Sequence, residues 1–210
     1  PAPALRVQQG SAGSSSRERI AVSELKAQTT HRQDGGEGKE VLSVQARTAA
    51  STSVRAMRGD LKLWDAELKS GLVCQASCKD VLFLGLSSGC LAVLRRRSGA
   101  PLLPLLHLDS VPVLLRVDSG SSEHAARLSL VSSSARLYSW QWDGQRKRLT
   151  ARARAQSFAG LLDGEEELSL LNVTFSEDGR RPLLEFSDGR RLLQREDLES
   201  WEEVDEARKD

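Results

Sequence analysis

Short apolar runs separated by small polar turns follow one another along most of this chain, and this pattern predicts β-strands. The turns recur every 8–12 residues or so, which is typical of all-β folds. No long segment before the last dozen residues shows the 3.6-residue period of an amphipathic helix. From Lys39 onward we expect strands at Val41–Ala46, Leu61–Trp64, Gly71–Gln75, Val81–Leu86, Leu91–Leu94, Leu102–Leu108, Val111–Val117, Leu128–Val131, Arg136–Trp142, Leu168–Phe175, Pro182–Phe186 and Arg191–Gln194.

One hairpin pattern, an apolar strand, a serine-containing turn and a second apolar strand, occurs three times. The turn serines are Ser87, Ser133 and Ser187, which are 46 and then 54 residues apart. A period of about 40–50 residues with about four strands per unit is typical of β-propeller blades. We therefore predict about three WD40-like, four-stranded antiparallel blades. A β-sandwich is the alternative for the same strands, because the period is uneven.

The ends of the chain differ from its middle. Residues 1–38 are rich in Ser, Gly, Gln and Ala, and we expect a flexible, disordered N-terminal linker with at most a short strand at Ile20–Leu25. Residues 39–210 form the predicted propeller domain. Three blades are too few to close a ring, so we expect the remaining blades outside this segment or on another chain. Near the other end, Ser200–Glu203 matches a capping box and predicts the start of a helix.

Composition narrows the classes of function. The chain has 30 Lys and Arg against 29 Asp and Glu, a net charge of +1, so no overall field attracts it to nucleic acid or to a membrane surface. It contains no apolar run long enough for a transmembrane helix. Hydrophobic residues are 39% of the chain but aromatic residues only 4%, so the core must consist mainly of Leu, Val and Ala.

The residues that usually perform chemistry are few and scattered. The three cysteines suit a reducing compartment and lack the second Cys or His pair of a zinc site, so we expect buried thiols. No P-loop, nucleophile elbow or HExxH motif occurs, and the three histidines are far apart. We therefore expect no enzyme, no cofactor, no metal site and no small-molecule substrate. The residues concerned are Cys74, Cys78, Cys90, His31, His107 and His124.

Four short stretches stand out by their order and spacing along residues 60–205. They are Gly99–Pro104, Ala135–Trp140, Pro182–Gly189 and Leu198–Trp201. The first is similar to a Gly-x-x-Leu-Leu-Pro turn, the second to an Ala-Thr-Leu-Ser-Val-Trp strand, the third to a Pro-Val-x-x-x-Ser-Asp-Gly hairpin and the fourth to a closing Leu-x-x-Trp. Taken together and in this order, they resemble the C-terminal domain of the HIRA/Hir family of histone chaperones. The order and spacing of the four pieces is more specific than any one of them.

This resemblance implies a nuclear, chromatin-bound scaffold. In the family, the C-terminal domain self-associates as a trimer and binds the large helical-repeat subunit of the complex. The complex deposits histones H3–H4 independently of DNA replication and represses some genes. We expect this domain to reach histones only through other subunits. The alternative is a propeller interaction domain of an unrelated scaffold, such as a ubiquitin-ligase or trafficking subunit.

The resemblance also implies a contact site, with one departure from the family pattern. The family's strand ends in a Trp-Asp pair thought to lie at the trimer contact. Here Trp140 holds the register of the family's Trp but is followed by Gln141, and the dipeptide appears later as Trp142-Asp143. Side chains alternate along a strand, so Trp140 and Trp142 share a face and either fits the contact. The alternative is that both simply pack within the propeller.

A second candidate surface is the run of basic residues after this strand. If the run is extended, Arg146, Arg148, Arg152 and Arg154 lie on one face. Guanidinium groups pair with phosphates and with carboxylates, so the stripe fits an acidic partner or phosphate. Direct nucleic-acid binding is not expected from the overall charge. The alternative is an outer blade strand whose charges prevent edge-to-edge pairing.

Overall fold

The computed structural model describes residues 5–8, 19–22, 28–31, 40–48, 50–58, 60–118, 125–162, 169–176, 181–195 and 200–204. Within them the regular structure is β-strand, apart from a single 3-10 turn at Ala159–Leu161. None of the helical structure in these residues has the length and apolar character needed to cross a membrane. The chain divides into two compact units. One unit is Lys26–Pro112, and the other combines Pro1–Leu25 with Val113–Asp210.

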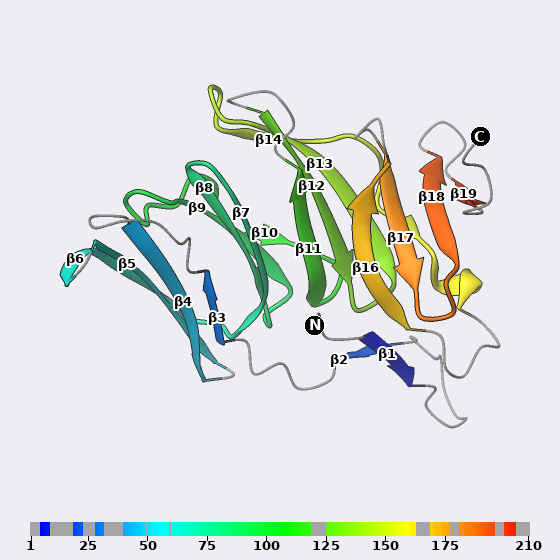
Figure 1. The fold of residues 1–210 in the computed structure, drawn as a ribbon, viewed down its shortest axis with the longest axis horizontal. Helices are drawn as coiled ribbons and strands as arrows, with labels where there is room; N and C mark the ends of the chain where they lie inside the picture. Colours follow the sequence, from blue (N-terminus) through cyan, green and yellow to red (C-terminus); the bar gives the residue numbers. More distant parts are fainter. Residues whose placement is uncertain are drawn as a thin grey trace. The chain divides into compact units, whose positions relative to one another are not determined.

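The unit Lys26–Pro112 contains two four-stranded sheets (Figure 1). In each sheet, strands that are consecutive in the sequence are neighbours and run antiparallel. The first sheet is β3 (Gln28–His31), β4 (Glu40–Thr48), β5 (Ser51–Arg58) and β6 (Leu61–Leu68). The second is β7 (Leu72–Cys78), β8 (Val81–Leu86), β9 (Cys90–Arg95) and β10 (Leu106–His107).

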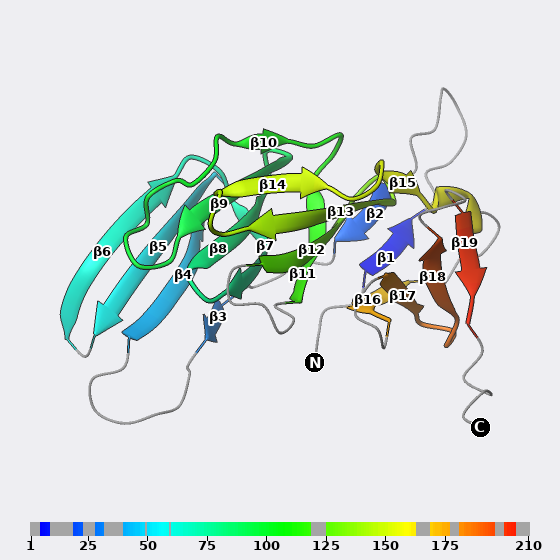
Figure 2. The same cartoon turned by 90° about the horizontal axis from the view of Figure 1, so that it is seen from above.

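The other unit repeats this arrangement, and Figure 2 shows β16 to β19 side by side in chain order. Its first large sheet is β11 (Pro112–Asp118), β12 (Ala125–Ser132), β13 (Arg136–Asp143) and β14 (Arg148–Ala151), with β15 (Gln156–Ser157) also paired to β13. Its second is β16 (Leu170–Phe175), β17 (Pro182–Phe186), β18 (Arg191–Arg195) and β19 (Ser200–Glu203). A two-stranded sheet joins β1 (Leu5–Gln8) and β2 (Arg19–Val22).

These sheets confirm the predicted fold class. A four-stranded antiparallel meander is the form of a propeller blade, and the described residues contain four of them where the sequence pattern showed three. The three predicted hairpins are β8–β9, β12–β13 and β17–β18, the middle strands of their blades. The repeated hairpin is therefore the centre of each blade, and the β-sandwich alternative is set aside.

Each unit has its own hydrophobic cluster. In Lys26–Pro112 the cluster joins the two blades through residues such as Val44 and Val54 from the first and Leu84 and Ala92 from the second. In the other unit Val131 and Leu137 of one blade pack with Val173, Leu184 and Phe186 of the next. Burying one face of a blade against its neighbour removes Leu and Val side chains from water, which is the main driving force for this packing.

The strand predictions fail where tertiary contacts override the local pattern. Ser200–Glu203 is strand β19 and not the start of a helix, because Trp201 packs into the cluster beside β18. The run Leu102–Leu108 contains only the two-residue strand β10, since Pro104 supplies no backbone N–H for a ladder. Strands β5, β14 and β15 were not predicted, because polar and charged residues dominate them.

Residues 1–38 fall largely outside the described part of the chain. The strand expected at Ile20–Leu25 overlaps β2 at Ile20–Val22. Strand β3 belongs to the first blade through its pairing with β4, so this blade begins before Lys39. The assignment of residues 1–38 as a flexible linker and of 39–210 as the domain stays a prediction.

Candidate functional site

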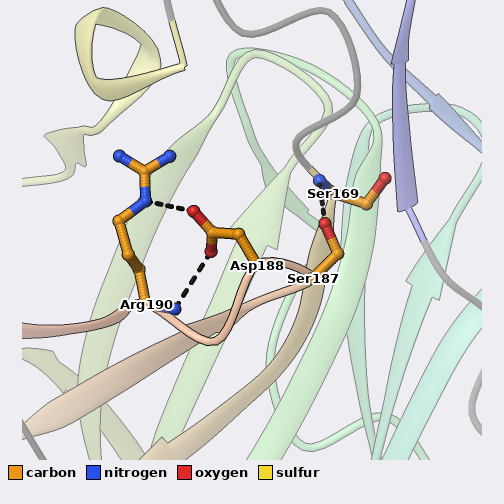
Figure 3. A network of polar contacts seen from close by, with 4 residues as sticks. All are labelled: Ser169, Ser187, Asp188 and Arg190. Carbon is orange, nitrogen blue, oxygen red and sulfur yellow. Dashed lines mark hydrogen bonds and ion pairs between the residues drawn. The ribbon is translucent and has the colours of Figure 1, made fainter.

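The serine at the tip of the repeated hairpin has a structural role. Ser187 Oγ accepts a hydrogen bond from the backbone N–H of Ser169 at 3.0 Å, and Ser187 N–H donates to Ser169 O at 2.9 Å (Figure 3). Ser87 makes the same two bonds with Gly71, at 3.0 and 2.8 Å. In these two hairpins, Ser87 and Ser187 therefore fasten the turn to the residue that precedes the first strand of the blade.

The acidic residue beside it completes the turn. Asp188 accepts hydrogen bonds from the backbone N–H of Arg190 and from its guanidinium (Figure 3). Partial desolvation raises the pKa of the Asp188 carboxyl, but the backbone and side-chain bonds and the positive charge of Arg190 outweigh it, so the pKa lies below its usual value. The Ser-Asp-Gly sequence thus specifies the geometry of the hairpin, and the Ser187 and Asp188 side chains form hydrogen bonds within their own blade.

The two candidate contact tryptophans lie on the same face of β13, as alternation predicts, but they differ in burial. Trp142 is only 3% exposed, and its neighbours in register are Ala126 and Leu149. Trp140 is half-buried and stacks on Tyr138, with 5.2 Å between ring centroids and 18° between ring planes. Trp140 is therefore the tryptophan of this pair with surface left for a partner, and Trp142 packs inside the molecule.

Asp143 has a local task. Its Oδ1 accepts hydrogen bonds from the backbone N–H groups of Gln145 and Arg146, both at 3.0 Å. These bonds hold the turn from β13 to β14, in which Lys147 has a positive φ of 52°. A carboxylate that caps its own turn has less capacity left for an intermolecular contact. Asp143 therefore holds this turn, whereas the ring of Trp140 keeps accessible surface.

The basic stripe is bent and not one extended strand. Arg146 lies in the turn, Arg148 begins β14, and Arg152 and Arg154 follow the end of β14 at Ala151. Arg146, Arg148 and Arg154 are exposed, and Arg152 is half-buried. Of the four arginines, only Arg148 is in a strand. The single strand face that the sequence analysis assumed does not form.

Cys74 and Cys78 are thiols of low reactivity. Burial raises the pKa of the Cys74 thiol to about 12, against a smaller lowering by its bond with Gly85. Burial and the negative charge of Asp80 raise the pKa of the Cys78 thiol to about 11. The thiolate is the reactive form of cysteine, and both thiols stay protonated near neutral pH.

The third cysteine has a polar neighbour. The Sγ atom of Cys90, a buried residue, lies 3.4 Å from Nδ1 of His107 on β10. Among the described residues no group of three or more His, Cys, Asp and Glu side chains is placed to hold a metal ion. His124 lies outside the described residues, and the side chain of His31 is likewise not described.

Sequence reasoning missed a polar row that joins the two blades of the second unit. The guanidinium of Arg116 on β11 donates to Asn172 Oδ1 on β16 at 2.9 and 3.1 Å. Asn172 Nδ2 donates to Glu185 on β17 at 3.2 Å, and Glu185 pairs with Arg191 on β18 at 3.5 Å. Arg116 and Asn172 are 56 residues apart in the sequence, so no local sequence pattern predicts their contact.

Comparison with known proteins points to one group. No known family model matches the chain. The chain is 32% identical to Protein HIRA from Caenorhabditis elegans over 139 residues, which are 66% of this chain and 14% of that protein. It therefore spans about one seventh of the length of this curated relative.

Solved structures share the fold at lower identity. A crystal structure of HIRA(644-1017) matches with a TM-score of 0.55 and 20% identity, over 78% of this chain and 49% of that one. BBS1N in complex with ARL6DN matches with a TM-score of 0.53, 12% identity and coverage of 79% and 48%. The computationally designed Ika8 protein also has a TM-score of 0.53, with 14% identity and coverage of 82% and 47%.

Several unrelated proteins thus share the fold, whereas HIRA is similar in both sequence and structure. The sequence match is well above the identity of the other neighbours. It agrees with the ordered pieces from Gly99–Pro104 to Leu198–Trp201 that predicted the resemblance. The chain is thus similar to HIRA in sequence over 139 residues, and it shares the fold of HIRA(644-1017).

Proposed function

We propose that this chain is the scaffold and oligomerisation module of a HIRA-type histone chaperone complex in the nucleus. The observation that supports the proposal most is the 32% identity to Protein HIRA over 139 residues. In this function the domain performs no catalysis. It self-associates as a trimer and binds the large helical-repeat subunit of the complex. Other subunits bring H3–H4 for replication-independent nucleosome assembly, and the complex regulates transcription.

The stacked pair of Tyr138 and Trp140 is the contact we propose for self-association. Large aromatic side chains dominate interface energies when a partner covers them, because they bury much area with few rotatable bonds. Trp140 is half-buried, so it has both a fixed ring and accessible surface. Trp142, at 3% exposed, supports the sheet beneath it and not the contact.

The test is the solution mass of the chain by light scattering on a sizing column. We expect a trimer for the unmodified chain at tens of micromolar. Trp140→Ala shifts it to monomer with unchanged circular dichroism. Trp142→Ala lowers the free energy of unfolding by about 3–5 kcal/mol, the usual cost of truncating a buried aromatic ring. Leu61→Ala, at a residue that is 64% exposed in the other unit, is the control and stays trimeric.

A stable monomer of the unmodified chain at the same concentration would contradict the oligomerisation role. The function would then be the alternative, an interaction domain of an unrelated scaffold. A trimer that survives Trp140→Ala would keep the proposed scaffold and place its contact elsewhere.

A further inference from the structure

The outer edge of the blade β11–β14 carries a dense positive charge. We name the segment Arg146–Arg154 the basic edge. It contains five Lys and Arg side chains and no acidic residue, and three of its arginines are exposed. The nearby carboxylate of Asp143 caps its own turn and lies 3.9 Å from Arg146, whose side chain is 80% exposed. Asp143 therefore offsets at most part of the charge of Arg146.

The same segment ends a sheet. Strand β14 is the last in the order β11–β12–β13–β14, so one side of its backbone pairs with β13 and the other side faces away from the sheet. The N–H of Arg152 donates to Ser139 O on β13. Because hydrogen-bonding direction alternates along an antiparallel strand, Arg148 and Thr150 also point their backbone groups to β13. The backbone groups of Leu149 and Ala151 then point outward.

An edge of this kind discriminates between partners. Like charges repel a second copy of the same edge, which prevents edge-to-edge aggregation. The same charges attract a strand of opposite sign, and outward N–H and C=O groups are what an added strand pairs with. A nucleic acid would use the charge but leave these backbone groups unpaired, and the chain's net charge of +1 supplies no wider field to hold it.

We propose that the basic edge binds an extended, acidic peptide segment of a partner protein by strand addition to β14. The backbone of Leu149 and Ala151 supplies the ladder bonds, and the arginines of the edge read alternate carboxylates of the peptide. Ala151 lies directly across from Trp140 in register, so this site adjoins the contact proposed for self-association. The solution mass of Ala151→Pro, measured in the same way as that of Trp140→Ala, shows whether a loss of peptide binding is separate from a loss of self-association.

The experiment measures binding of a fluorescent alternating Glu-Val octapeptide to the full chain by anisotropy. A second peptide has the same sequence with N-methyl groups on alternate residues, which keeps the charge and blocks strand pairing. The variants are Ala151→Pro, which removes an outward N–H without breaking the bonds to β13, and the charge variant Arg148→Gln with Arg154→Gln. The matched control is Arg58→Gln with Lys69→Gln, two exposed cations elsewhere.

We expect saturable binding of the first peptide and loss of binding for the N-methylated one. The charge variant weakens binding about three- to tenfold, as exposed ion pairs are individually modest, and the control leaves it unchanged. Ala151→Pro abolishes binding with an unchanged circular dichroism spectrum. Two outcomes overturn the proposal: equal binding of the N-methylated peptide, or a single-stranded oligothymidylate that binds the edge while the acidic peptide fails to compete.

Discussion

At the scale of single residues, Gly99 has little freedom to change. Its φ is +67°, and a Cβ added there would lie 2.5 Å from the ring of Trp64 on β6. Both the backbone conformation and the close ring exclude a larger side chain. Gly99 lies in the Gly-x-x-Leu-Leu-Pro turn and lets the turn after β9 pack against the neighbouring blade.

We predict that Gly99→Ala lowers the free energy of unfolding by about 2–4 kcal/mol, from left-handed strain and the clash together. Gly189→Ala is the matched control. Gly189 also has a positive φ, of 90°, but nothing lies within 4 Å of its added Cβ. It should cost only about 1–2 kcal/mol. Urea unfolding followed by circular dichroism measures both, and equal losses would show that the Trp64 contact contributes nothing.

The sequence predicts that Trp140 and Trp142 lie on the same face of their strand, but it does not predict which of them is more buried. Alternation along β13 depends only on the local chain, so Trp140 and Trp142 were correctly put together. Their burial depends on neighbours from other strands, such as Leu149 beside Trp142, and that information is not local. Asp143 likewise resembled a contact residue, and its turn-capping bonds appear only once the turn is folded.

At the scale of elements, β19 shows how tertiary packing overrides a local signal. The capping-box pattern of Ser200–Glu203 favours a helix, yet the segment pairs with β18. Trp201 Nε1–H donates to Ser157 O at 3.2 Å, and its ring meets Phe158 edge to face at 5.8 Å. Burial of this ring in the cluster of the second unit favours the strand over the helix.

We predict that Trp201→Ala lowers the free energy of unfolding by about 2–4 kcal/mol and that Trp201→Phe, which keeps an aromatic ring, costs about 1 kcal/mol. Hydrogen exchange supplies the structural readout. Amides of β18 and β19 should lose protection in Trp201→Ala, while those of β12 and β13 keep theirs. Unchanged protection at β19 in Trp201→Ala would mean that the strand is held by its backbone ladder and not by the ring.

Three of the four central hairpins were predictable from the sequence, and the outer strand β14 was not. The apolar strands β8 and β17 match their predicted bounds, Val81–Leu86 and Pro182–Phe186, because continuous apolar runs bounded by turns mark buried strands. The outer strand β14 is polar, with the sequence Arg-Leu-Thr-Ala, and became recognisable only as the partner of β13. The blade that the sequence pattern missed is β3–β6, because its inner strand β5, with the mixed sequence Ser-Thr-Ser-Val-Arg-Ala-Met-Arg, was not predicted.

At the scale of the whole molecule, the two hydrophobic clusters belong to different units and have no residue in common. Val44 and Val54 face each other in register on β4 and β5 in the unit Lys26–Pro112. Val173 lies in the cluster of the other unit. Substitutions at distant sites without shared partners usually add, and substitutions of contacting residues do not.

We predict that Val54→Ala and Val173→Ala each lower the free energy of unfolding by about 1.5–3 kcal/mol, the cost of two buried methyl groups and the space they leave. Their combination should equal the sum to within about 0.5 kcal/mol. The matched comparison is Val44→Ala with Val54→Ala, where the second truncation enters a space the first has already opened, so the pair should depart from the sum by more than this. Urea unfolding of the unmodified chain and of the five variants gives all the values. A large departure from the sum for Val54 and Val173 would show that the two clusters form one cooperative core. The stability of each blade would then depend on residues in the other unit.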